Sequence, residues 1–168
     1  WSLFGQVTHG ILERSATKGI AEKRYYATFL GKKISAQVDL LNEDGTLEDY
    51  KTTTVYKAMP KSDKSDFVSQ MNLQKWVLEQ NGIEVKKLQV VALLRDWSKM
   101  AAMREPDYPV GQVVIIPIVT WKKEMVEEFL ASRITEHEKA KEVLPECNSE
   151  ERWEKPPRFA VMKKGRSS

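Results

Sequence analysis

Apolar and polar residues alternate most regularly between residues 33 and 41, where every second position is apolar: Ile34, Ala36, Val38 and Leu40. A period of two residues is typical of a β-strand with one buried face. The sequence Asn-Glu-Asp-Gly at residues 42–45 has the composition of a turn. Residues 47–56 are rich in Thr, Val and Tyr, which suit a second strand. The pattern therefore predicts a β-hairpin over residues 33–56.

The rest of the chain divides into further helices and strands. Apolar residues at helical spacing predict helices at residues 1–18, 66–80 and 122–143. Aromatic or continuous apolar runs predict strands at residues 22–30, 85–97 and 112–121, with irregular loops at 57–66 and 100–111. This order predicts an α/β fold with a mixed central sheet flanked by helices.

Several local features follow from the same pattern. Asp66 is expected to cap the helix at 66–80, and Gln70 and Gln74 are assigned to its polar side. The strand at 85–97 is expected to be covered on both faces, and the strand at 112–121 is also expected to be buried. Pro117 indicates that the strand at 112–121 lies at a sheet edge or contains a bulge.

The length of 168 residues, with 41% hydrophobic and 30% charged, suits one globular domain with a sizeable core. We assign residues 1–144 to this domain and residues 145–168, where prolines break the pattern, to a C-terminal tail or the start of a truncated element. Because the chain opens on Trp1 rather than methionine, we expect a fragment of a longer protein. Any protein partner is expected to bind through the missing or C-terminal segments.

Charge and cysteine content exclude several classes of protein. A net charge of +3 is too small for a histone-like binder, so nucleic-acid affinity would have to come from local patches. The single cysteine, Cys147, excludes an internal disulfide and a four-cysteine iron–sulfur cluster, which favours a reducing cytoplasm. No apolar run approaches the ~20 residues that span a bilayer, so we expect no membrane association.

The predicted hairpin carries two acids and a lysine that should converge. Pairing of its strands sets Asp39 near Asp49, and the period of two puts Lys51 on the same face as Asp49. Neighbouring carboxylates repel unless a cation lies between them, and Mg²⁺ is usually held by one or two carboxylates with water and phosphate oxygens. This combination suits phosphodiester hydrolysis. The alternative is a hairpin whose charged residues simply face water.

The same residues resemble a known nuclease core. Asp39 followed by Asp49-Tyr50-Lys51-Thr52 resembles the D…(D/E)xK pattern of the PD-(D/E)xK nuclease superfamily, and DYKT is closest to its RecB-like branch of phage and bacterial exonucleases. Residues 5–13 resemble the branch's GxxxHxxLE helix, and residues 70–74 resemble its QxxxY motif. Gln74 stands where the family usually has tyrosine, so its role stays open.

The resemblance implies a restriction-endonuclease-like core and a metal-dependent DNA nuclease, more specifically an exonuclease of DNA replication, recombination or repair. It implies Mg²⁺ or Mn²⁺ as cofactor, with Lys51 positioning water and Gln70 placing substrate or solvent. The implied metal ligands are His9, Asp39, Asp49 and the Tyr50 carbonyl. Glu13 and Gln74 are further candidates, and a solvated helix acid is an equal alternative for Glu13. A bacterial cell or a phage-infected host is the expected setting.

Basic residues lie on the loops that flank this predicted site: Lys57, Lys61, Lys64, Lys99 and Arg104. They suit the phosphate backbone of DNA. The alternatives are a solvated connection for the first loop and a lid without chemistry for the second. Two rival functions remain open at this point. One is a catalytically silent protein of the same fold that binds nucleic acid or a partner, because fold does not fix activity. The other is an RNA endonuclease, for which no aromatic-rich RNA motif is present.

Overall fold

The computed structural model of the chain describes residues 19–149, 151, 152, 154, 155 and 157–159. The predicted helix at residues 1–18, which includes His9 and Glu13, lies outside the described residues. The elements in chain order are β1 (Ile20–Phe29), β2 (Lys32–Leu41), β3 (Thr46–Thr53), α2 (Val55–Ala58), α3 (Ser65–Gln80), β4 (Lys87–Leu94), α4 (Lys99–Ala102), β5 (Val113–Ile118) and α5 (Lys123–Lys139).

The strands form one mixed five-stranded sheet in the order β1-β2-β3-β4-β5. The pairs β1–β2, β2–β3 and β4–β5 are antiparallel, whereas β3 and β4 are parallel. A parallel pair needs a crossover connection, and α3 supplies it. The predicted α/β fold is thus confirmed, and it is consistent with a restriction-endonuclease-like core.

Two turns connect the first three strands. Leu30 and Gly31 join β1 to β2, and both have positive φ, +46° and +71°. Two successive positive φ values match the twist of the paired strands, which is why Gly at the second position is favourable. The turn predicted at residues 42–45 is confirmed by hydrogen bonds from Gly45 N to Asn42 O (3.0 Å) and from Thr46 N to Asp44 Oδ1 (2.9 Å).

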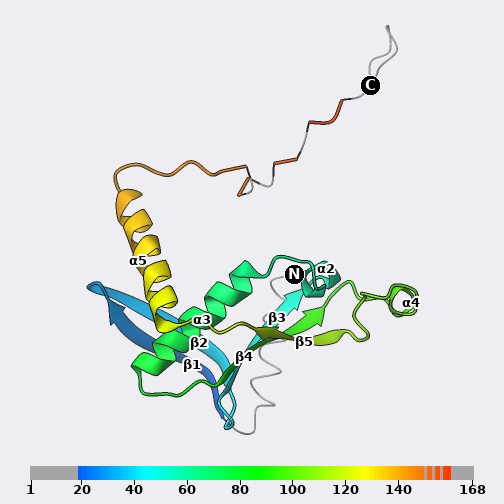
Figure 1. Cartoon of the computed structure of the whole chain (residues 1–168), viewed down its shortest axis with the longest axis horizontal. Coiled ribbons are helices and arrows are strands. Elements are labelled where there is room, and N and C mark those ends of the chain that lie inside the picture. Colours follow the sequence, from blue (N-terminus) through cyan, green and yellow to red (C-terminus); the bar gives the residue numbers. More distant parts are fainter. Residues whose placement is uncertain (1–18, 150, 153, 156, 160–168) are drawn as a thin grey trace. The chain divides into compact units, whose positions relative to one another are not determined.

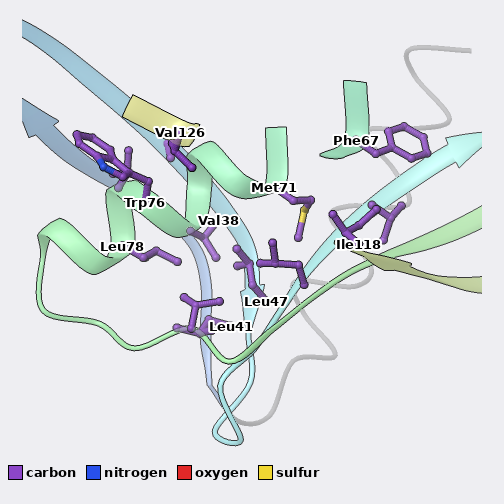
Figure 2. Packing of buried hydrophobic residues seen from close by; sticks show 14 of the residues in the cluster. Val38, Leu41, Leu47, Phe67, Met71, Trp76, Leu78, Ile118 and Val126 are labelled. Carbon is purple, nitrogen blue, oxygen red and sulfur yellow. The ribbon is translucent and has the colours of Figure 1, made fainter. Parts of the chain in front are cut away.

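The main core lies between α3 and the sheet. Figure 2 shows Met71 and Leu78 of α3 near Val38, Leu41 and Leu47 of β2 and β3, and all five belong to one buried cluster. Burying one side chain of this size stabilises a fold by ~1.5–3 kcal/mol, so packing holds α3 in place. The polar residues on this helix are therefore carried to a fixed position over the sheet (Figure 1).

Some predicted element boundaries were wrong. Residues 55 and 56 do not continue β3 but start α2, where Asp96 Oδ1 accepts a hydrogen bond from Val55 N at 2.7 Å. Asp66 does not cap α3, because the N-cap is Lys64 and Asp66 lies in the first turn. The loop predicted at 100–111 overlaps the single helical turn α4, whose N-cap Ser98 accepts a hydrogen bond from Ala101 N.

The burial of the last two strands also differs from expectation. β4 is buried on one face only, with alternate residues half-exposed. β5 lies at the edge of the sheet, as Pro117 predicted, because an edge strand tolerates a residue without an N–H group. Its Val113 and Ile115 are 59% and 60% exposed, so an apolar run alone did not reveal which face was covered.

The chain splits into two compact units between Ala131 and Ser132, within α5. The first unit contains the sheet and α3. In the second unit, Arg133 pairs with Glu136 at 2.9 Å and Lys141 with Glu138 at 2.7 Å on the helix and its continuation. Exposed ion pairs of this kind contribute at most ~1 kcal/mol.

Candidate active site

Asp39 lies in β2 where the ladders on both sides of this strand are irregular. Between β2 and β3 the regular register covers Leu40↔Glu48 and Leu41↔Leu47. In place of a further ladder bond, Asp39 Oδ2 accepts a hydrogen bond from Tyr50 N at 2.8 Å. On the other side, Glu22 lies between the register pairs that flank Asp39 and has φ +48°. Such a conformation is uncommon for a residue other than glycine and is frequent at functional sites.

Asp49 lies in the neighbouring strand β3 and is almost fully buried, with 2% of its surface exposed. Its Oδ1 accepts a hydrogen bond from Gln70 Nε2 of α3 at 2.8 Å. Lys51 Nζ lies 2.8 Å from Oδ2, which confirms that Lys51 and Asp49 share a face of β3. The structure thus brings Gln70 and Lys51 to one carboxylate.

One oxygen of Asp49 keeps coordination capacity. Oδ2 accepts no hydrogen bond from the described part of the chain, although the Lys51 ammonium is close to it. The short distance therefore describes an ion pair without hydrogen-bond geometry. The Lys51 ammonium offsets part of the cost of burying this charge, and the oxygen can still coordinate a cation.

This donor set fits a hard divalent cation. Mg²⁺ and Mn²⁺ prefer carboxylate and carbonyl oxygens, and one or two carboxylates suffice when water and phosphate complete the coordination. The described residues contain no group of three or more His, Cys, Asp or Glu placed to hold a metal. Within them, Asp39, Asp49 and the Tyr50 carbonyl are the candidate ligands, and the predicted ligand His9 lies outside the described residues.

The Tyr50 side chain belongs to a separate polar group. Its hydroxyl donates to Glu48 Oε2 at 3.2 Å, and Gln89 Nε2 donates to Glu48 Oε1 at 2.6 Å. Burial, together with the carboxylates of Glu48 and Asp39, raises the pKa of Tyr50 to about 12. The phenol is therefore neutral at physiological pH. Sequence reasoning missed Glu48 and Gln89, because their contact depends on the parallel pairing of β3 with β4.

The two glutamines of α3 differ in their surroundings. Gln70 is half-buried and holds Asp49. Gln74 was assigned to the polar side of the helix, but this is wrong, because it is 7% exposed. Its Nε2 donates to the backbone carbonyl of Gln37 in β2 at 3.0 Å. A sequence signal existed, since position 74 continues the buried stripe of Phe67, Met71 and Leu78.

The five basic residues predicted to bind DNA fall into two groups. Lys57 Nζ pairs with Asp66 at 2.8 Å, and Lys64 Nζ donates to Met59 O at 2.7 Å. These two ammonium groups stabilise the loop between β3 and α3. No ion pair or hydrogen bond with another described residue involves the side chain of Lys61, Lys99 or Arg104, all of which are exposed. DNA binding by the five remains a prediction.

Both basic loops lie at the same end of the sheet, where β3 and β4 finish. β3 and β4 run parallel, so their carboxyl ends meet there. Figure 1 shows α2 and α4 beyond the ends of these two strands.

Among the described helices, none is both long and apolar enough to cross a membrane.

Comparison with known proteins gives a likeness of fold. No protein-family model matches the chain, and the search of curated protein sequences found no significant match. Two solved structures resemble it. The crystal structure of SSO0001 aligns with a TM-score of 0.49 and 15% identity, covering 80% of this chain and 59% of that protein.

The second structure is a protein from Eubacterium rectale that is provisionally named an exonuclease. It aligns with a TM-score of 0.50 and 10% identity over 96% of this chain and 61% of that protein. The chain therefore spans about three fifths of the length of each of these two proteins. At such low identity the likeness concerns the fold.

Proposed function

We propose that the chain is the catalytic core of a metal-dependent DNA nuclease of the PD-(D/E)xK superfamily, RecB-like branch. The observation that carries this proposal is the buried Asp49, held by Gln70 and Lys51, with Oδ2 free of hydrogen bonds from the described residues. Asp39 of the neighbouring strand binds the backbone N of Tyr50, the residue after Asp49. A fold shared with a protein provisionally named an exonuclease supports it, and exonuclease action is the preferred form.

The residues of the site have separate roles in this proposal. Mg²⁺ or Mn²⁺ would be held by Asp39, Asp49, the Tyr50 carbonyl and His9. When bound, the ion would act as a Lewis acid, which lowers the pKa of water and offsets negative charge on the phosphate. Gln70 fixes the orientation of the Asp49 carboxylate through its 2.8 Å hydrogen bond. Lys51 lies close enough to Oδ2 to position the attacking water and to stabilise negative charge that develops at phosphorus.

Binding of DNA is assigned to the basic loops at the carboxyl ends of β3 and β4. Their residues Lys57, Lys61, Lys64, Lys99 and Arg104 would contact phosphates, which positions the backbone without reading its sequence. A role in replication, recombination or repair in the cytoplasm of a bacterial or phage-infected cell fits this activity. Protein partners are proposed to bind through segments beyond the described sheet.

The test is incubation of linear and circular DNA with the protein, with and without Mg²⁺ or Mn²⁺. We expect cleavage only with metal, and loss of cleavage in Asp49→Asn. Asp107→Asn is the matched control, because Asp107 is exposed and makes no hydrogen bond or ion pair with a described residue. Cleavage of linear DNA alone identifies an exonuclease. DNA binding without cleavage under any of these conditions would instead identify a catalytically silent protein of this fold.

A further inference from the structure

Helix α3 carries two amide side chains, one turn apart, that bind different strands of the site. Gln70 Nε2 donates to Asp49 Oδ1 in β3 at 2.8 Å, and Gln74 Nε2 donates to Gln37 O in β2 at 3.0 Å. Residues four apart share a helix face, so both amides project toward the sheet. Because packing fixes α3, these two bonds tie β2 and β3 to one rigid element.

These ties lie where the two strands lack regular pairing with each other. The regular register of β2 with β3 stops at Leu40↔Glu48, next to Asp39. A depression of about 340 Å³ lies beside α3, and its lining includes Gln37, Gln70 and Gln74 with the apolar side chains of Ile34 and Leu73. At this depression, outside the core formed by Val38 and Met71, apolar packing does not fill the space between β2 and the helix. The Gln74 amide is a direct polar link across it.

The Gln74 side chain is a costly choice for fold stability. It is 7% exposed, and no donor among the described residues binds its Oε1. The nearby buried amide of Asn72 is fully engaged, since it donates to Val68 O and Val119 O and accepts from Trp121 N. A buried acceptor without a partner lowers stability, so methionine at position 74 would serve packing as well or better.

We propose that Gln74 is a positioning residue for Asp39. By holding Gln37 it fixes β2 in the register in which Asp39 Oδ2 accepts the Tyr50 N–H, next in sequence to the Asp49 that Gln70 holds. Gln74 acts through the backbone and does not contact substrate. The metal-binding consequence rests on the proposed nuclease function, whereas the positioning of Asp39 does not.

The test is Gln74→Met, which keeps the size of the side chain but removes both the donor and the unpaired acceptor. The Tyr50 amide proton should exchange with solvent about fivefold faster, the factor expected from weakening one ordinary hydrogen bond. The melting temperature should equal or exceed that of the wild type. Mn²⁺ affinity, measured by calorimetry, should fall, and kcat should fall with an unchanged KM for DNA.

Gln80→Met is the matched control, because Gln80 is exposed at the end of the same helix. It should leave amide exchange, Mn²⁺ affinity and kcat unchanged. Wild-type exchange at Tyr50 in Gln74→Met would overturn the proposal, as would a fall in melting temperature that accounts for faster exchange throughout the sheet. Absence of metal-dependent cleavage by the wild type would overturn the nuclease function instead, and the exchange measurement would still decide the role of Gln74.

Discussion

Asp49 is placed where a carboxylate would be unfavourable without its two neighbours. Moving a charge from water into a protein interior costs several kcal/mol unless partners offset the lost hydration. The Gln70 amide and the Lys51 ammonium provide that compensation on opposite oxygens. Because Oδ2 still receives no hydrogen bond from the described residues, a cation gains a ready ligand there. The buried Asp49 carboxylate, which lowers stability, is thus the same group that we propose as a metal ligand.

The acids and the lysine should separate in their effects on metal and on rate. Asp39→Asn or Asp49→Asn removes one of two formal negative charges, so Mn²⁺ affinity should fall and high Mn²⁺ should partly restore cleavage. Lys51→Ala removes a neighbouring positive charge, so Mn²⁺ should bind as well or better. Its cleavage rate should nevertheless fall by ~10²–10³, the usual effect of losing one electrostatic stabiliser.

Calorimetric titration of Mn²⁺ into each variant, paired with cleavage at saturating metal, checks this division. Asp107→Asn again serves as the control for a change of one carboxylate. The proposed roles are wrong if Lys51→Ala loses metal together with activity. They are also wrong if Asp49→Asn cleaves at the wild-type rate in the absence of added metal.

At the scale of elements, the sequence predicted those parts of the fold that depend on local patterns. The alternation from Ile34 to Leu40 and the turn before Thr46 correctly gave the β2–β3 hairpin, and the apolar stripe gave α3. The parallel pairing of β3 with β4 depends on contacts far apart in sequence, which local patterns do not encode. The short helices α2 and α4 were missed, because four residues are too few to show a helical period.

The candidate site was predictable to a similar degree. The period of two placed Lys51 beside Asp49, but it could not show that Asp39 accepts from the Tyr50 backbone. That bond exists because the regular ladder between β2 and β3 stops nearby. Gln74 was misplaced because glutamine is usually a surface residue, although its position in the buried stripe argued otherwise.

The turn between β1 and β2 should be improved by one substitution. Leu30 has φ +46°, a conformation that costs a residue with a large side chain ~1–2 kcal/mol. Asn tolerates this conformation, so Leu30→Asn should raise the free energy of unfolding by ~1 kcal/mol in urea denaturation. Val110→Asn is the control, because it also removes an exposed apolar side chain but not at positive φ. An equal gain in both variants would show that turn geometry is not the cause.

The turn between β2 and β3 should contribute to the loss of stability in acid. The backbone and side chain of Thr46 hydrogen-bond the Asp44 carboxylate and lower its pKa below the ordinary 3.8. A lowered pKa favours the folded state above the unfolded pKa, and this contribution disappears as pH falls through the folded value. Asp44→Ala should therefore destabilise the protein at neutral pH, with a difference that shrinks below about pH 4.

Denaturant unfolding of Asp44→Ala at a series of pH values measures this effect. Asp107→Ala is the control, because Asp107 makes no hydrogen bond with a described residue. Its difference from the wild type should remain small throughout. A stability difference for Asp44→Ala that persists undiminished at low pH would contradict an ionised-carboxylate role.

At the scale of the whole molecule, local charge matters more than net charge. The net charge of the chain is only +3, but the two basic loops lie together beyond the carboxyl ends of β3 and β4, at one end of the sheet. Asp96 joins these regions, since its carboxylate accepts from Val55 N at the start of α2. This hydrogen bond connects the two loops that carry the exposed cations. A fixed pair of loops suits a surface along which a phosphate backbone could lie.

Salt dependence of DNA binding should separate the two groups of cations. Each phosphate neutralised contributes ~0.9 to the slope of log affinity against log salt, because bound counterions are released. Changing Lys61, Lys99 and Arg104 together to Gln should therefore reduce the slope by ~3. Changing Lys57 and Lys64 should reduce it by less than ~2, because their ammonium groups already contact Asp66 and Met59.

The control is Lys86→Gln with Lys87→Gln, at the opposite end of the sheet where β4 begins, and it should leave the slope unchanged. Titration of fluorescent DNA at several salt concentrations measures all three slopes, and equal slopes for the first and last variants would rule out the end with the basic loops as the DNA-binding surface.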